Sequence, residues 1–186
     1  MVLTDREIQS AIESGQILID PLPDETAYSA SSLDLTLGNI LQQWKTPSVE
    51  GVDQIVSPGQ KGYRYSDFEK TYSIKKKIKS EGYVLEPHSF ILGWTKESID
   101  LPTYSRIAAR VEGKSSLARV GIGVHVTAPT IHAGFTGTIQ LEICNHGPLK
   151  VRLLPGMRVC QLIFEQTLGT AEKGYVGQFY RQGLKS

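Results

Sequence analysis

At 186 residues, with 40% hydrophobic side chains, the chain is long enough to bury one core and does not require a second domain. Its 20 basic and 19 acidic residues leave a net charge of +1, which excludes a general attraction to nucleic acids or to anionic membranes. Cys144 and Cys160 are too few for a disulfide framework and lack the spacing of a metal site. We therefore expect reduced thiols in a single-domain cytoplasmic protein, with neither nucleic-acid nor membrane partners.

The N-terminal region predicts one helix and two strands. Residues 4–7 (TDRE) form a capping box, and apolar side chains follow at helical spacing until Gly15. Residues 17–19 (ILI) are typical of a short strand, and residues 32–38 (SLDLTLG) alternate as a second strand with Asp34 on its polar side. The chain turns polar within its first four residues, so we expect no signal peptide or membrane span.

The middle of the chain is less regular. Residues 40–80 mix Gly, Pro, Lys and Ser with scattered aromatics, and we predict loops and short strands there. The basic run at 75–79 has no interleaved aromatics and indicates a solvated surface stretch.

From residue 83 onward, short apolar or alternating runs are separated by Gly and Pro turns. This pattern favours an all-β barrel or double-sheet jelly roll with the N-terminal helix and one short inner helix. The strand at 159–164 is apolar on both faces apart from Gln161, so it is either central or covered by another subunit. The predicted strands are 83–85, 90–94, 106–111, 122–126, 138–143, 151–154 and 159–164.

Residues 113–119 (GKSSLAR) have the composition of an anion-binding turn. A glycine, a cation and two hydroxyls at the start of a short helix offer backbone N–H groups and side-chain donors to a phosphate. The hydroxyls of Ser115 and Ser116 are equally compatible with ordinary helix caps. Arg119 returns to the helical face of Ser115 and either reaches the same pocket or forms a surface salt bridge.

The strand at 138–143 places one carboxylate away from the core. Ile139, Leu141 and Ile143 share one face, whereas Gln140 and Glu142 share the other. Glu142 beside a phosphate-binding turn suits general acid/base work, but alternation alone also fits a plain amphipathic strand. Zinc-site spacing, the zinc-deaminase signature, P-loops and nucleophile elbows are all absent, so a deaminase of this sequence would have to activate water without zinc.

The end of the chain is glycine-rich, polar and punctuated by aromatics. Residues 169–181 fit either a frayed terminus or a flap that orders over a ligand.

Six segments in order resemble the dCTP deaminases, a branch of the trimeric dUTPase superfamily. The resemblance implies a mainly β, distorted jelly-roll fold of the dUTPase-like type, forming one domain over 1–186 with 169–186 as a flexible flap. It also implies a homotrimer with active sites between subunits. The matching segments are LTDREI (3–8), SLDLTLG (32–38), the loop 113–119, VHVTA (124–128), AGFTG leading into Leu141 and Glu142 (133–142), and LPGM (154–157).

The same resemblance assigns roles to individual residues. Glu142 would take a proton from water for attack on C4 of dCTP, yielding dUTP and ammonia, with Ser115 and Arg119 positioning the water and the glutamate. Magnesium would accompany the triphosphate, and His125 and Thr127 match a region linked in the family to feedback inhibition by dTTP. The implied substrate-binding residues are the loop Lys114, Ser115, Ser116, Leu117, Ala118 and Arg119, the base and sugar contacts Ala128, His132, Gln140 and Leu141, then Gln161, and the flap residues Tyr175 and Gln178.

Two departures from the family pattern keep alternatives open. His132 stands where an aspartate is usual, and an imidazole is not a permanent anion. Lys114 replaces the common arginine, which keeps the charge but loses the bidentate fork. The alternatives are a bifunctional enzyme that continues from dCTP to dUMP and diphosphate, to which residues 161–164 (QLIF) also have a resemblance, and a catalytically silent nucleotide-binding trimer.

Overall fold

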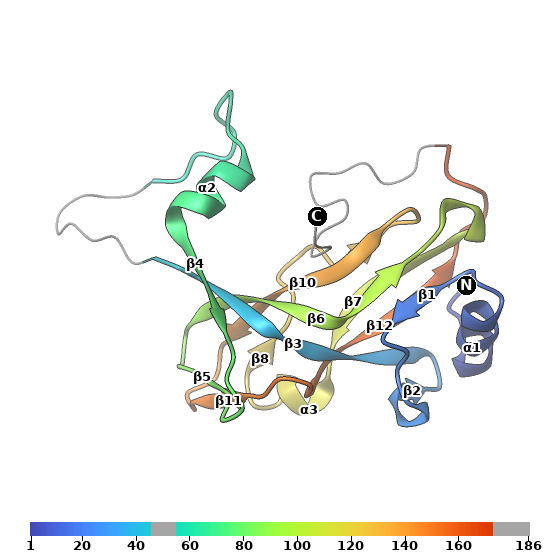
Figure 1. The fold of residues 1–186 in the computed structure, drawn as a ribbon, viewed down its shortest axis with the longest axis horizontal. Helices are drawn as coiled ribbons and strands as arrows, with labels where there is room; N and C mark the ends of the chain where they lie inside the picture. The colour runs from blue at the N-terminus through green and yellow to red at the C-terminus, as the bar shows by residue number, and fades with distance from the viewer. Residues whose placement is uncertain (46–54, 173–186) are drawn as a thin grey trace.

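The computed structural model describes residues 1–45 and 55–172, and it is built mainly of β-strands (Figure 1). All the paired strands run antiparallel, in the order β8-β10-β6-β3-β12-β7-β9. The bounds are β3 (Ser32–Trp44), β6 (Phe90–Asp100), β7 (Ile107–Gly113), β8 (Ile122–Gly123), β9 (Thr130–Ile131), β10 (Thr136–Asn145) and β12 (Arg158–Gln166).

Smaller strands complete the fold. β1 (Leu18–Asp20) pairs with β6, while β2 (Tyr28–Ser29) and β4 (Ser73–Lys77) pair with β3. β5 (Tyr83–Leu85) and β11 (Val151–Leu153) form a separate two-stranded sheet.

The long strand β3 connects the two halves of the curled sheet. Its first half pairs with β12 and its second half with β6, and the register with β6 shifts between Leu37 and Leu41. Gly38 lies in this shift, where an added Cβ would stand 3.0 Å from the carbonyl oxygen of Trp94. A strand that changes partner at an irregularity makes the corner of a double-sheet fold. The mainly β jelly-roll prediction is confirmed.

Both predicted helices are present. α1 (Asp5–Glu13) begins at the capping box of Thr4 and Glu7 and buries Ile8 and Ala11. α3 (Ser115–Ala118) is the short inner helix. Two short 3-10 helices, η1 (Glu25–Ala27) and η2 (Thr103–Ser105), are also present. In the described ranges no helix has the length and apolar character needed to cross a bilayer.

The prediction for residues 40–80 was wrong in part. The strand predicted to end at residue 38 continues to Trp44, and a helix, α2 (Tyr65–Tyr72), precedes β4 (Figure 1). α2 buries none of its residues fully, but Tyr65, Phe68 and Tyr72 recur at helical spacing, and the first two pack on Trp44. The sequence prediction missed this short aromatic stripe. The lysines at 75–77 lie exposed on β4, as expected of a solvated stretch.

Strand pairing decides between the alternatives for the strand at 159–164 and shortens the strand predicted at 122–126. β12 lies between β3 and β7, which supports the central alternative for the strand at 159–164. The strand predicted at 122–126 ends at Gly123. Val124 is nevertheless buried, so the apolar alternation there reflects packing of a loop and not strand pairing. Cys144 and Cys160 are both free thiols.

Candidate functional site

β10 presents its polar side chains outward, as predicted. Ile139, Leu141 and Ile143 are buried in the core, whereas Gln140 and Glu142 are partly exposed. β6 holds β10 in place, with Leu92 opposite Glu142. The Glu142 carboxylate accepts a long hydrogen bond, 3.4 Å, from the backbone N–H of Val126.

A pocket of about 250 Å³ opens beside Glu142. Five of the predicted site residues line it: Ala128, His132, Gln140, Leu141 and Glu142. The remaining lining is mostly apolar and consists of Val111, His125, Thr130, Ile131, Phe135 and Ile139. A carboxylate in a small, mostly apolar pocket is suited to moving protons on a bound ring, because the pocket limits competing water.

His125 also lines this pocket, although it is not among the predicted catalytic or substrate-binding residues. Its Nδ1 is inaccessible to solvent and has no hydrogen-bond partner among the described residues. The sequence signal was only its place in the matching segment 124–128. Buried nitrogens without partners are uncommon, so this atom is a candidate contact for a bound molecule.

Cys144 is the next outward side chain on β10 after Glu142. Burial raises the pKa of the Cys144 thiol, and the nearby Glu142 carboxylate raises that pKa further. The pKa of the Cys144 thiol therefore depends in part on the negative charge of Glu142.

The predicted phosphate loop does not join this pocket within one chain. Ser115, Ser116, Ala118 and Arg119 are exposed, and Leu117 packs partly on the core. None of the residues 114–119 lines the pocket that contains Glu142.

The cap and salt-bridge alternatives for this loop are not observed among the described residues. The N-cap of α3 is Lys114, with no side-chain cap hydrogen bond, and the described ion pairs do not involve Arg119.

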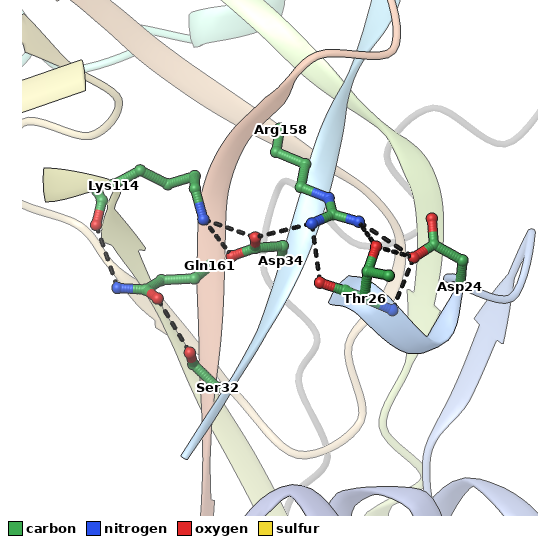
Figure 2. A network of polar contacts seen from close by, with 8 residues as sticks. Asp24, Thr26, Ser32, Asp34, Lys114, Arg158 and Gln161 are labelled. Carbon is green, nitrogen blue, oxygen red and sulfur yellow. Dashed lines mark hydrogen bonds and ion pairs between the residues drawn. The ribbon is translucent and has the colours of Figure 1, made fainter. Parts of the chain in front are cut away.

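Lys114 is held by a buried carboxylate at the start of the loop. Its Nζ lies 2.6 Å from each oxygen of Asp34, whose side chain is only 6% exposed (Figure 2). Arg158 approaches the same carboxylate at 3.8 Å and also pairs with Asp24 at 3.1 Å. The alternation placed Asp34 on a polar face, but its partners are 80 and 124 residues distant in sequence and could not be read from it.

Gln161 fastens the loop to β12. Its Nε2 donates to the carbonyl of Gly113 at 3.2 Å, and its Oε1 accepts from the Ser32 hydroxyl at 2.9 Å (Figure 2). Both the oxygen and the nitrogen of the Gln161 amide therefore have protein partners. Gln161, which was predicted to bind substrate, here holds the backbone of Gly113, the residue before Lys114.

Buried anions lie close to Cys160. Glu97 is 4% exposed and accepts hydrogen bonds from the N–H and hydroxyl of Thr36 at 2.9 and 2.7 Å. Burial raises the pKa of the Cys160 thiol, with added contributions from Glu97 and Asp34. Cys160 is thus a protonated core residue.

The remaining predictions for the end of the chain are only partly within the structure. Residues 169–172 are exposed and have no regular secondary structure. The flap residues Tyr175 and Gln178 lie outside the described residues.

A family model and two relatives of this chain point to the same family. The family model described as dCTP deaminase-like matches residues 2–167. The dCTP deaminase of Rhodospirillum rubrum is 39% identical over 94% of this chain and 87% of its own length. The dUMP-forming dCTP deaminase of Methanosphaera stadtmanae is 38% identical over 94% of this chain and 83% of its own.

A solved structure agrees with these relatives. The 2'-deoxycytidine 5'-triphosphate deaminase of Agrobacterium tumefaciens superposes with a TM-score of 0.68 at 25% identity over 89% of this chain. The chain spans about half, 48%, of that protein's length. With the family model covering most of the sequence, the chain belongs to the dCTP deaminase-like family.

Proposed function

We propose that this protein hydrolyses the 4-amino group of dCTP, giving dUTP and ammonia without zinc. The observation that carries the proposal is the outward Glu142 carboxylate in a small pocket that also contains Ala128, His132 and Gln140. Its membership of the dCTP deaminase-like family and the names of its relatives support the same reaction.

Glu142 has the chemistry that this reaction needs. The carboxylate takes one proton from water, and the resulting hydroxide adds to C4 of the cytosine ring. Glu142 then delivers that proton to the ring, and proton transfers through the same carboxylate bring the amino nitrogen to a neutral leaving group. The C4–N bond breaks to release ammonia, and a carbonyl remains at C4. One water is consumed and one ammonia leaves, so the step balances.

We infer that the complete site lies between subunits of a homotrimer. The support is the separation of the loop 114–119 from the Glu142 pocket within one chain, since both are required by the resemblance. In the trimer, Ser115 and Arg119 of a neighbouring subunit would position the water and Glu142. Lys114 and the loop backbone would hold the triphosphate, with magnesium bound by the phosphate oxygens, and Tyr175 and Gln178 would close over the nucleotide.

His132 bears on the alternative, bifunctional reaction. The name of the Methanosphaera relative states that it forms dUMP, which favours keeping this second candidate. His132 is exposed at the pocket and lacks the permanent negative charge of an aspartate, which weighs against activation of a second water. A silent nucleotide-binding trimer is the remaining alternative, and inhibition by dTTP and a cytoplasmic location stay predictions.

One product assay separates these functions. The purified protein is incubated with dCTP and, separately, with dUTP in the presence of magnesium, and the nucleotides are resolved by chromatography. dUTP and ammonia from dCTP, with dUTP left unchanged, support the deaminase. Formation of dUMP supports the bifunctional enzyme, and binding of dCTP without any product would mean that the proposal of turnover is wrong.

A further inference from the structure

Helix α2 carries a tyrosine toward the outward face of β10. β6 pairs with β10 so that Trp94 lies opposite Gln140. Tyr65, the first residue of α2, lines a cavity of about 1040 Å³ together with Trp94 and Gln140. From the sequence we predict only loops and short strands for this stretch, with no residue of the site.

Aromatic packing fixes the Tyr65 ring. Its ring meets Trp44 of β3 edge-on, with centroids 6.3 Å apart. Phe68, one turn later on α2, packs on the same Trp44 at 5.0 Å, and Tyr72 packs on Phe68 at 4.9 Å. Offset and edge-to-face contacts of this kind restrict the ring orientation, so the Tyr65 hydroxyl is delivered to a defined place.

That place is the Gln140 side chain. Gln140 makes a side-chain hydrogen bond to the Tyr65 hydroxyl. Gln140 also lines the 250 Å³ pocket next to Glu142, so it forms a wall common to the pocket and to the larger cavity. Burial raises the pKa of Tyr65 to about 12, and the negative charges of Glu69 and Glu142 add to this rise. The phenol therefore stays neutral and keeps its proton at any ordinary working pH.

We propose that Tyr65 is a positioning residue of the deaminase site, which acts by holding the Gln140 side chain in the pocket wall beside Glu142. The inference rests on the function proposed above and extends it to an element outside the six sequence segments that carried the resemblance. If the Gln140 side chain is fixed before dCTP binds, it keeps the cytosine ring at the right distance from the Glu142 carboxylate. Small misplacements of reacting groups lower the rate strongly.

The first test is Tyr65→Phe, which keeps the ring and removes only the hydroxyl. The expected result is a fall in kcat for dCTP of about three- to tenfold, the loss typical of one hydrogen bond, with KM changed by less than about twofold. Tyr72→Phe is the matched control because it removes a hydroxyl from the same helix and aromatic cluster, and it should leave kcat unchanged. A Tyr65→Phe enzyme with normal kcat but a lower melting temperature would mean that Tyr65 is only structural, and would overturn the proposal.

The second test asks whether Tyr65 acts through Gln140. In a double-mutant cycle, Tyr65→Phe combined with Gln140→Leu should be no slower than Gln140→Leu alone. Losses that multiply would show independent action and would contradict the inference.

The wild-type product assay is performed first, so that the two proposals fail separately. If the wild-type protein releases no ammonia from dCTP, the proposed function is wrong. If the wild-type protein is active and Tyr65→Phe keeps a normal kcat, the proposed function stands and the positioning role of Tyr65 is overturned.

Discussion

Two polar clusters of this protein differ in how completely their groups are paired. Around Asp34, the carboxylate, the Lys114 ammonium and both ends of the Gln161 amide have close protein partners (Figure 2). Around Glu142, the observed N–H contact is long, and Nδ1 of His125 has no partner among the described residues. Groups satisfied by the protein hold a loop in place, whereas groups left with spare hydrogen-bonding capacity in a pocket are available to a ligand.

This difference separates the scaffold of the site from its chemistry. The Asp34 cluster joins β3 and β12 to the start of the proposed phosphate loop, and such preorganisation would lower the entropy cost of ordering that loop around a nucleotide. The Glu142 pocket lies on β10, whose buried face fixes the direction of the carboxylate. Substitutions should therefore affect stability in the first cluster and turnover in the second.

Glu142→Gln is expected to have the largest effect. The amide keeps the size of the side chain but cannot accept a proton from water, so ammonia release from dCTP should fall by about a hundred- to ten-thousandfold. Nucleotide binding, followed by calorimetry, should persist.

Glu165→Gln is the matched control, because Glu165 is a partly exposed glutamate on β12 that pairs with Arg110 outside the pocket. It should retain activity. Normal turnover by Glu142→Gln would mean that Glu142 does not act in the reaction and that the chemistry does not lie in its pocket.

Asp34→Asn should mainly destabilise the fold. It leaves Lys114 and Arg158 without their shared buried anion, and breaking such a pair costs about 3 kcal/mol of unfolding free energy. Urea unfolding measures the loss. Asp67→Asn, which breaks the exposed pair with Arg64, should cost less than about 1 kcal/mol. Equal losses in the two variants would show that the Asp34 cluster is no more than a surface ion pair.

Gln42→Leu should increase stability. Gln42 lies on β3, is 1% exposed, and neither amide atom has a hydrogen-bond partner among the described residues. Replacing a buried unpartnered amide by an apolar side chain of similar size should raise the unfolding free energy by about 1–2 kcal/mol. A lower urea midpoint would mean that the amide is satisfied in solution, for example by water.

Local pattern was enough for much of this architecture and insufficient for the rest. The capping box at Thr4 and the alternation around Glu142 predicted α1 and the outward carboxylate, because both depend on neighbours in sequence. The ion pair between Asp34 and Lys114 joins residues 80 positions apart, and the contact from Tyr65 to Gln140 depends on how α2 docks. Such long-range contacts leave no periodic signal, and the aromatic stripe of α2 spans only two turns of a short helix.

Cys144 offers a smaller effect that tests the charge of Glu142 without any substrate. Burial is the larger cause of the raised Cys144 pKa, and the Glu142 carboxylate adds to it. Removing that negative charge in Glu142→Gln should lower the pKa of the thiol, so more thiolate forms at pH 8 and alkylation by iodoacetamide becomes modestly faster.

Mass spectrometry follows the labelling of each cysteine. Cys160 is completely buried, so it should stay unlabelled in both proteins and serves as the internal control. Glu165→Gln should not change the Cys144 rate. If Glu142→Gln labels no faster than the wild type, the carboxylate does not act on Cys144 in solution, and the pocket geometry around β10 would have to differ from the one described. Faster alkylation of Cys144 in Glu142→Gln would show, without any measurement of turnover, that the negative charge of Glu142 lies beside the outward face of β10. A loss of ammonia release in the same variant would then follow from the missing charge and not from a displaced strand.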